Sequence, residues 1–118
     1  MSDRESRPAI LQGTLDLMVL QTVASLGPQH GYAIASRIER ASDSALELNM
    51  GTLYPALHRL ERQKWIAATW KLSANKQRTR VYRLTAAGRR QLVSERTKWD
   101  TLVDAMAGIL ARPQEQES

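Results

Sequence analysis

Lysine and arginine side chains are concentrated in one part of the sequence, between Gly51 and Lys98. This part holds twelve basic residues against two acids, Glu61 and Glu95, so its formal charge is +10. The remaining residues hold five bases and ten acids, and the net charge of the whole chain is +5. Basic side chains that neutralise phosphates release condensed counterions, so such a region attracts polyanions. Charge alone leaves DNA, RNA and an acidic membrane surface open as partners.

The residues that enzymes and metal sites need are sparse and unpaired. The sequence contains no cysteine, which excludes a disulfide framework, a thiolate zinc site and a cysteine nucleophile. His30 and His58 have no carboxylate or cysteine at metal-ligand spacing. We find no pairing of a nucleophile with a base and no phosphate-cradling glycine loop. We therefore expect a protein that is not an enzyme and that uses no cofactor or metal.

Length and composition predict one folded domain with an appended element. The chain has 118 residues, of which 42% are hydrophobic and 25% are charged, as in ordinary globular proteins. The polar start MSDRESRP leads into no long apolar segment, and no run of about 18 uncharged apolar residues occurs. We therefore expect a cytoplasmic protein with no membrane partner.

Two helices are predicted before residue 42. Apolar residues at three- and four-residue spacing predict the first from about Ile10 to Leu26, ending at Gly27-Pro28; they are Leu11, Leu15, Met18, Val19, Val23 and Leu26. The second is predicted from Gly31 to about Arg40, and the residues expected to face inward are Tyr32, Ile34, Ala35 and Ile38. A turn over residues 41–48 follows, with Leu46 and Leu48 directed toward the core.

The third predicted helix has Leu53, Leu57 and Leu60 on its buried side. We expect five residues to lie elsewhere around the helix, away from that buried side: Thr52, Ala56, Arg59, Gln63 and Lys64. Two starts remain open. With Thr52 as N-cap, Pro55 lies in the first turn, where its missing N–H is harmless; with Asn49 as N-cap, Pro55 lies deeper and costs a hydrogen bond to the Gly51 carbonyl.

A hairpin and a long helix are predicted to complete the chain. Residues 66–72 and 80–85 alternate with a period of two, as half-buried strands do, with Ile66, Ala68, Trp70 and Leu72 on one face of the first strand. The basic tip between them covers residues 74–78. Thr85 is expected to cap a helix that reaches Ala111, about 40 Å long, which exceeds the thickness of the domain.

These elements predict a mainly α (α+β) fold, a winged helix-turn-helix with a long C-terminal dimerisation helix. The expected division is a flexible arm over residues 1–9, a winged-helix domain over 10–85, a dimerisation helix over 86–111 and a flexible tail over 112–118. In such a fold one helix enters the major groove of DNA and its N-terminal side chains meet base edges. The hairpin tip meets flanking phosphates or enters the minor groove.

Three motifs sharpen this prediction. His30-Gly31-Tyr32 opens the second helix, residues 51–61 have the sequence GTLYPALHRLE, and residues 82–88 have the sequence YRLTAAG. In order and spacing, over about residues 10–110, these motifs resemble the PadR family of bacterial transcriptional regulators. The resemblance implies a repressor whose second and third helices and wing bind an operator, and whose C-terminal helix forms a homodimer. It also favours Asn49 as the start of the third helix.

From these observations the predicted DNA-binding residues are Tyr32, Asn49, Gly51, Thr52, Tyr54, His58, Arg59, Lys76, Gln77, Arg78 and Arg80. For Tyr54, packing and a phosphate contact remain equal alternatives, as do DNA contact and plain solvent exposure for His58. One departure from the family is Lys64, where glycine is frequent. If this position has a positive φ, lysine there costs about 1 kcal/mol.

The apolar residues of the last helix carry a second prediction. Dimer-interface or effector-binding residues are expected to be Leu15, Trp99, Leu102, Val103, Met106 and Leu110. The resemblance implies a sharper role for Trp99. Drug-sensing members of the family carry a tryptophan at the corresponding distance from the Ala-Gly of the third motif, and that tryptophan stacks on planar ligands. A filled interface and a pocket for a small planar aromatic or cationic effector both remain open.

The predicted partner is a double-stranded DNA operator in the bacterial nucleoid. A two-fold dimer needs an inverted repeat with half-sites about 10 bp apart or a multiple of it. Two rival functions remain: a repressor of the same fold without a ligand, and a winged helix that binds protein or RNA.

Overall fold

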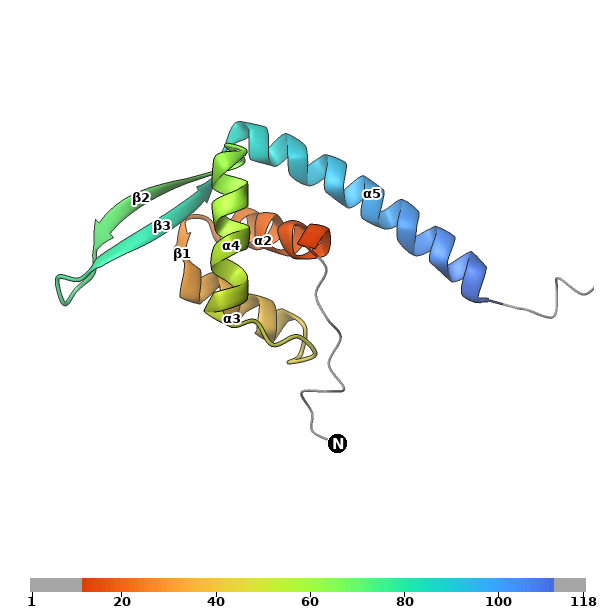
Figure 1. Cartoon of the computed structure of the whole chain (residues 1–118), viewed down its shortest axis with the longest axis horizontal. Coiled ribbons are helices and arrows are strands. Elements are labelled where there is room, and N and C mark those ends of the chain that lie inside the picture. Colours follow the sequence, from red (N-terminus) through yellow and green to blue (C-terminus); the bar gives the residue numbers. More distant parts are fainter. Residues whose placement is uncertain (1–11, 112–118) are drawn as a thin grey trace, which may run out of the picture.

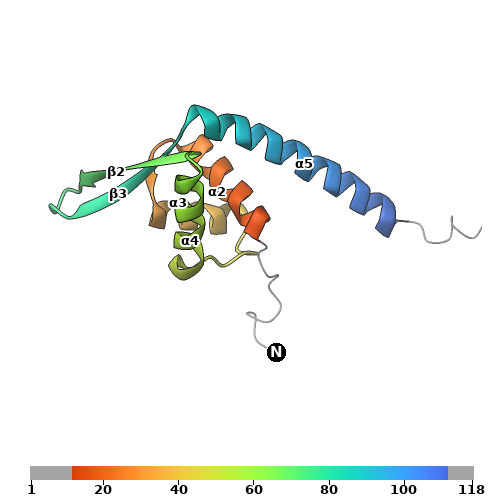
Figure 2. The ribbon, with the colours of Figure 1, turned by 45° about the horizontal axis from the view of Figure 1, so that its top comes forward.

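A computed structural model of the chain describes residues 12–111. Along the chain they form α2 (Gln12–Leu26), β1 (Gln29–His30), α3 (Gly31–Ala41), α4 (Met50–Arg62), β2 (Ile66–Leu72), β3 (Arg78–Leu84) and α5 (Ala86–Leu110). Helices α2, α3 and α4 form a head, from which the β2–β3 hairpin and α5 project to opposite sides (Figures 1 and 2). This is the predicted winged helix-turn-helix with a long C-terminal helix. The predicted arm and tail, with Ile10 and Leu11, lie outside the described residues. Among residues 12–111, no helix is long and apolar enough to cross a membrane.

The core of the head is built where α4 packs against α2, α3 and the base of the hairpin. The predicted inward side of α4 is confirmed, since Leu53, Leu57 and Leu60 are almost fully buried. Ala56 is also fully buried, although it was expected elsewhere on the helix. Because α4 lies between two helices and a strand, its buried arc is wider than one leucine stripe, and a small side chain lets the backbones approach closely.

Helix α3 begins at His30, whose imidazole Nδ1 accepts a hydrogen bond from the Ala33 amide at 3.3 Å. The predicted role of His30 in starting the helix is therefore confirmed. The inward orientation expected of Tyr32 is wrong, because this side chain is 72% exposed. Gly31 fills the buried position instead, and a Cβ there would lie 3.1 Å from the Met50 side chain.

Helix α4 begins at Asn49, as the family resemblance favoured. The Asn49 Oδ1 atom accepts a hydrogen bond from the Thr52 amide at 2.9 Å. The helix ends in a Schellman motif, in which the Trp65 amide donates to the Leu60 carbonyl and the Lys64 amide donates to the Glu61 carbonyl. Lys64 has a φ of 65°, so it occupies the left-handed conformation that glycine adopts without strain.

The sheet has the strand order β1-β3-β2 and is antiparallel throughout. Strand β1 was not foreseen, because two residues are too few to show a period; it pairs Gln29 with Tyr82 and His30 with Val81. The hairpin register runs from the pair Ile66 and Leu84 at the base to the pair Leu72 and Arg78 near the tip. We call the β2–β3 hairpin, residues 66–84, the wing.

The wing is half-buried only near its base. Ile66 and Tyr82 are in the core, but Trp70 is 56% and Leu72 is 70% exposed, although all four lie on the same face. The prediction that the whole face of β2 is half-buried is therefore wrong for its outer part. The alternation of side chains decides which face a residue occupies, whereas the extent of the head decides where burial stops.

Helix α5 begins at Thr85, as predicted, and Ala111 is its C-cap. The Thr85 hydroxyl accepts from the Gly88 amide at 2.9 Å and donates to the Lys64 carbonyl at 2.7 Å. The first turns of α5 cover the head, where Leu92 is buried, and residues 96–110 are exposed along their whole length. The far end of α5 thus leaves the head, as its predicted length required (Figure 1).

Candidate nucleic-acid interface

The N-terminal half of α4 presents a free face. Its exposed residues include Gly51, Thr52, Tyr54 and His58, which alternate along the helix with buried leucines. Tyr54 is 49% exposed, so its ring is partly packed while the rest is accessible. An exposed helix N-terminus of this kind has free backbone N–H groups and the positive end of the helix dipole.

Asn49 has less freedom than its position suggests. Its side-chain oxygen is already the N-cap acceptor for the Thr52 amide. An asparagine that reads adenine uses both its oxygen and its NH₂ group on the base edge. While the cap is intact, Asn49 has only its NH₂ group to offer a ligand.

A hollow of about 450 Å³ separates the free face of α4 from the wing. The predicted residues Tyr32, Tyr54, His58, Arg78 and Arg80 all contribute to its lining. The fold therefore gathers predicted residues from α3, α4 and β3 around one concave surface. The other lining residues are His30, Gly31, Trp70, Thr79 and Tyr82.

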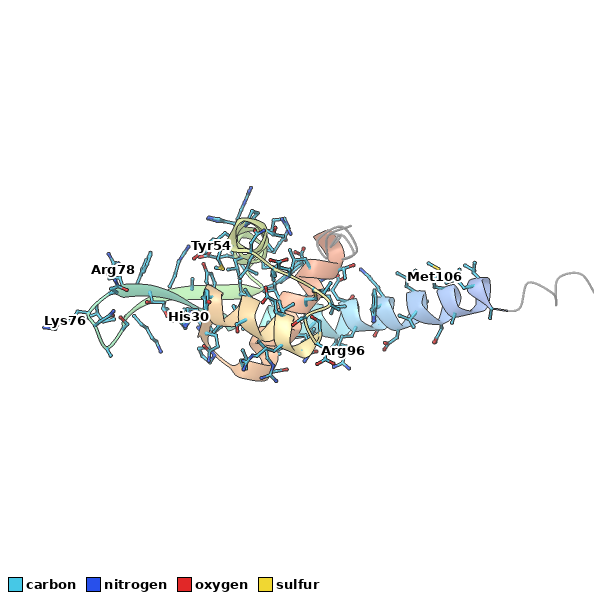
Figure 3. All side chains as sticks on the ribbon, turned by 90° about the horizontal axis from the view of Figure 1, so that it is seen from below. His30, Tyr54, Lys76, Arg78, Arg96 and Met106 are labelled. Carbon is cyan, nitrogen blue, oxygen red and sulfur yellow. The ribbon has the colours of Figure 1, made fainter. Side chains whose placement is uncertain are left out.

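The outer part of the wing carries cations on an aromatic support. The Arg78 guanidinium lies 4.6 Å from the centroid of the Trp70 ring, within the range of a cation–π contact. Lys76 and Gln77 are exposed in the turn beyond it, and Lys76 adopts a φ of 65° there. Figure 3 shows Lys76 and Arg78 near the outer end of the wing. Trp70 was missed as a site residue, because an alternating strand pattern assigns it to the core.

Arg80 differs from Arg78 in being tied to the head. Its Nη2 atom lies 2.6 Å from Glu61 Oε2 near the end of α4, and the two side chains are 35% and 28% exposed. Burial raises the pKa of the neighbouring Tyr82 phenol above its ordinary value, and the positive charge of Arg80 opposes that rise. Tyr82 is therefore neutral at neutral pH, and the negative partner of Arg80 is Glu61.

Arg59 does not line the hollow between α4 and the wing, and neither do the predicted residues Asn49, Gly51, Thr52, Lys76 and Gln77. The Arg59 side chain extends toward α2, where Nη2 lies 2.8 Å from Asp16 Oδ1. It lines a separate hollow with Asp16, Arg62 and Trp65. Its charge is thus neutralised locally by an acid that lies 43 residues away in the sequence.

The residues expected at a dimer interface or effector pocket fall into two groups. Leu15 is 3% exposed and belongs to the core of the head, so it does not line a free surface. The other five lie on α5 and are between 43% and 72% exposed; they are Trp99, Leu102, Val103, Met106 and Leu110. Figure 3 places Met106 at the end of the molecule opposite the wing.

Trp99 lies where α5 crosses the first half of α2. A hollow of about 570 Å³ on one side of it is lined by Thr14, Leu17, Met18, Gln21, Arg96 and Asp100. A second, of about 250 Å³, includes Gly13, Glu95, Lys98 and Leu102. The indole is therefore accessible from both sides in a single chain. Among residues 12–111, no group of three or more histidine, cysteine or acidic side chains could hold a metal ion.

Comparisons with known proteins show the family and the fold of the chain. Residues 19–94 match the family model described as "Transcriptional regulator PadR-like family". The chain is 33% identical over 79 residues to the transcriptional regulator Rv3488 of Mycobacterium tuberculosis, a match that covers 67% of this chain and 70% of that protein.

Two solved structures of transcriptional regulators have a similar fold. A transcriptional regulator from Clostridium thermocellum superposes with a TM-score of 0.75 at 25% identity, covering 86% of this chain and 96% of that one. A PadR family transcriptional regulator from Eggerthella lenta superposes with a TM-score of 0.71 at 31% identity, covering 85% and 84%.

Proposed function

The chain belongs to the PadR-like family of transcriptional regulators, and we propose that it represses transcription by binding, as a homodimer, to an operator in double-stranded DNA. The family and the fold are those of regulators rather than enzymes. The site of action is then the bacterial nucleoid.

One observation carries the proposal: the free face of α4 and two cations of the wing, Arg78 and Arg80, border the same hollow. Thr52, Tyr54 and His58 lie on that face, and a major groove about 12 Å wide admits a single helix in this orientation. Lys76 and Arg78 then meet phosphates beside the groove or enter the adjacent minor groove. The phosphate contacts supply affinity, and the side chains of α4 supply the choice of sequence.

The exposed apolar residues of α5 support dimerisation. Leu102, Val103 and Met106 are each about half exposed, and they recur at the spacing that places them on one side of a helix. A contiguous apolar stripe of this kind marks an interaction surface. Pairing through α5 gives a two-fold dimer with two identical heads, and hence an inverted-repeat operator.

The hollows beside Trp99 support regulation by a small planar effector. An aromatic ligand stacked on the indole would lie between α2 and α5, the elements that set where the heads stand relative to the dimer axis. Such a ligand changes DNA binding only if it binds the two arrangements of the dimer with different affinity. A dimer in which a second α5 fills both hollows would instead be a repressor without an effector.

The test is selection of bound sequences from a random DNA pool, followed by titration of the purified dimer. We expect an inverted repeat with half-sites about 10 bp apart, or a multiple of it, and affinity that falls steeply as salt is raised. A protein that is monomeric at the assay concentration, or that binds every duplex as its charge alone dictates, contradicts the proposal.

A further inference from the structure

Two arginines on the same face of β3 have different surroundings. Arg78 and Arg80 both lie against Trp70, with their guanidinium carbons 4.6 Å and 5.8 Å from the ring centroid. Arg78 is exposed and has no acidic partner within 4 Å among residues 12–111. It is therefore free to meet a phosphate while the indole limits its motion.

The Arg80 side chain is contacted on several sides, although 35% of it is exposed. One guanidinium nitrogen contacts Glu61 at 2.6 Å, and the guanidinium carbon lies 5.9 Å from the Tyr82 ring. The Nε atom is buried and has no hydrogen-bond partner in the part of the chain that the structure describes. Arg80 thus reaches from the wing to α4, and its guanidinium is bound to Glu61 rather than free.

We propose that Arg80 is a positioning residue, which fixes the angle between the wing and α4 through its ion pair with Glu61. The inference rests on the proposed DNA-binding function. The Glu61–Arg80 pair then determines how far Arg78 stands from the bases that α4 reads. The pair adds to the attachment of the wing at its base, where Ile66 and Tyr82 are buried.

Whether removal of the Glu61 charge strengthens or weakens DNA binding separates a positioning role from a direct contact. Glu61 is an acid beside a surface proposed to bind phosphates, so its removal strengthens DNA binding if only charge matters. If instead Glu61 holds Arg80 and the wing in place, its removal weakens binding to the operator. Glu61→Gln keeps the size of the side chain and removes its charge.

The experiment uses the full chain, the selected operator and a duplex of random sequence, with affinity measured by fluorescence anisotropy at several salt concentrations. We expect Glu61→Gln and Arg80→Gln each to weaken operator binding about fivefold or more, and the double variant to be no weaker than the worse single variant. Binding of Glu61→Gln to the random duplex is expected to be unchanged or stronger. A general loss of folded protein would lower both affinities together.

The salt dependence provides a second readout. Arg78→Gln is expected to reduce the slope of log affinity against log salt by about 1, because one phosphate contact is lost. Arg80→Gln is expected to leave that slope unchanged. Matched controls remove the same charges elsewhere: Arg83→Gln on the opposite face of β3, and Asp104→Asn on the exposed far part of α5. Neither is expected to lower the preference for the operator over the random duplex.

A third readout needs no DNA. The chain has three tryptophans, so its NMR spectrum contains three indole N–H signals, and Trp70→Phe identifies the one from Trp70. Glu61→Gln is expected to shift the Trp70 signal and leave that of Trp99 in place. Operator affinity of Glu61→Gln that equals or exceeds that of the wild type, or an unmoved Trp70 signal, overturns the proposal. If the wild type selects no operator, the proposed function fails, and the Trp70 signal alone decides whether the pair positions the wing.

Discussion

At the scale of single residues, Lys64 shows how the backbone angle φ limits which residue types fit without strain. It occupies the position after the α4 C-cap with a φ of 65°, where the Schellman hydrogen bonds require the left-handed conformation. A residue with a Cβ is strained there, whereas glycine is not. The preceding residue, Gln63, has an ordinary φ of −76°.

Lys64→Gly is therefore expected to raise the free energy of unfolding by about 1 kcal/mol, because strain is relieved in the folded state. The matched control is Gln63→Gly, which introduces the same residue where no strain exists. It is expected to lower the free energy of unfolding by about 0.5 to 1 kcal/mol. Urea denaturation at one protein concentration measures both, and a loss of stability in Lys64→Gly would show that its φ carries no strain.

Trp99 carries a prediction about ligands. If an effector binds in the hollows beside it, planar phenolic or cationic compounds quench the fluorescence of the wild-type protein at micromolar concentrations. Trp99→Ala retains Trp65 and Trp70, and it is expected to show no quenching. Equal fractional quenching in the two proteins would mean that the compounds act elsewhere.

At the scale of elements, the junction of α4, the wing and α5 is closely packed. The Trp65 carbonyl accepts a hydrogen bond from the Thr85 amide at 3.1 Å, and Gly88 of α5 lies against the same carbonyl. A Cβ built on Gly88 would lie 2.0 Å from that oxygen, which is far inside a van der Waals contact. Only glycine fits without displacing the backbone.

Gly88→Ala is expected to lower the free energy of unfolding by at least about 2 kcal/mol, because α5 must move away from the head. Gly108→Ala is the matched control, since a Cβ there has nothing within 4 Å. In an exposed helix interior it is expected to raise the free energy of unfolding by up to about 1 kcal/mol. Thermal unfolding followed by circular dichroism compares the two, and an unchanged Tm in Gly88→Ala would contradict the close approach.

The helices and their ends could be predicted from the sequence because their determinants are local. Thr85 caps the helix that begins at the next residue, and Leu53, Leu57 and Leu60 share one side of α4 through helical periodicity alone. The start of α4 was the exception, because the residues left both Thr52 and Asn49 open and only the family resemblance favoured Asn49. The wing and its basic tip also followed from local alternation and composition.

What the sequence could not show depends on contacts between distant residues. From the sequence, Arg59 and Arg80 were expected to be free cations. In the structure they bind Asp16 and Glu61, which lie 43 and 19 residues away. Trp70 and Leu72 read as core because the pattern cannot show where the head ends. The sequence pattern predicted that Tyr32 faces inward. It is Gly31 that lies against α4, and no nearby residue in the sequence indicates this contact.

At the scale of the whole molecule, charged and apolar surfaces lie at opposite ends. The wing carries Lys76 and Arg78, and the far half of α5 carries exposed Leu102, Val103 and Met106 (Figure 3). Thr101 lies on the other side of α5, where its hydroxyl bonds the Thr97 carbonyl at 3.0 Å. The helix thus has an apolar side and a polar side beyond the head.

Met106→Glu is expected to weaken the proposed dimerisation roughly a hundredfold or more, because it places an unpaired charge in the proposed apolar interface of each chain. Thr101→Glu adds the same charge on the polar side and is expected to leave the dimer intact. Sedimentation equilibrium measures both constants. A Met106→Glu protein that remains as strongly dimeric as the wild type would remove α5 from the interface.

Only Thr85 stands between the last residue of the wing, Leu84, and the first residue of α5, Ala86. Its hydroxyl also bonds the Lys64 carbonyl at 2.7 Å, so α5 continues from the head without slack. In a dimer joined through α5, the distance between the two α4 helices would then be fixed. This distance would set the spacing between half-sites, and an operator longer or shorter by a few base pairs would rotate one half-site away from the α4 helix that binds it.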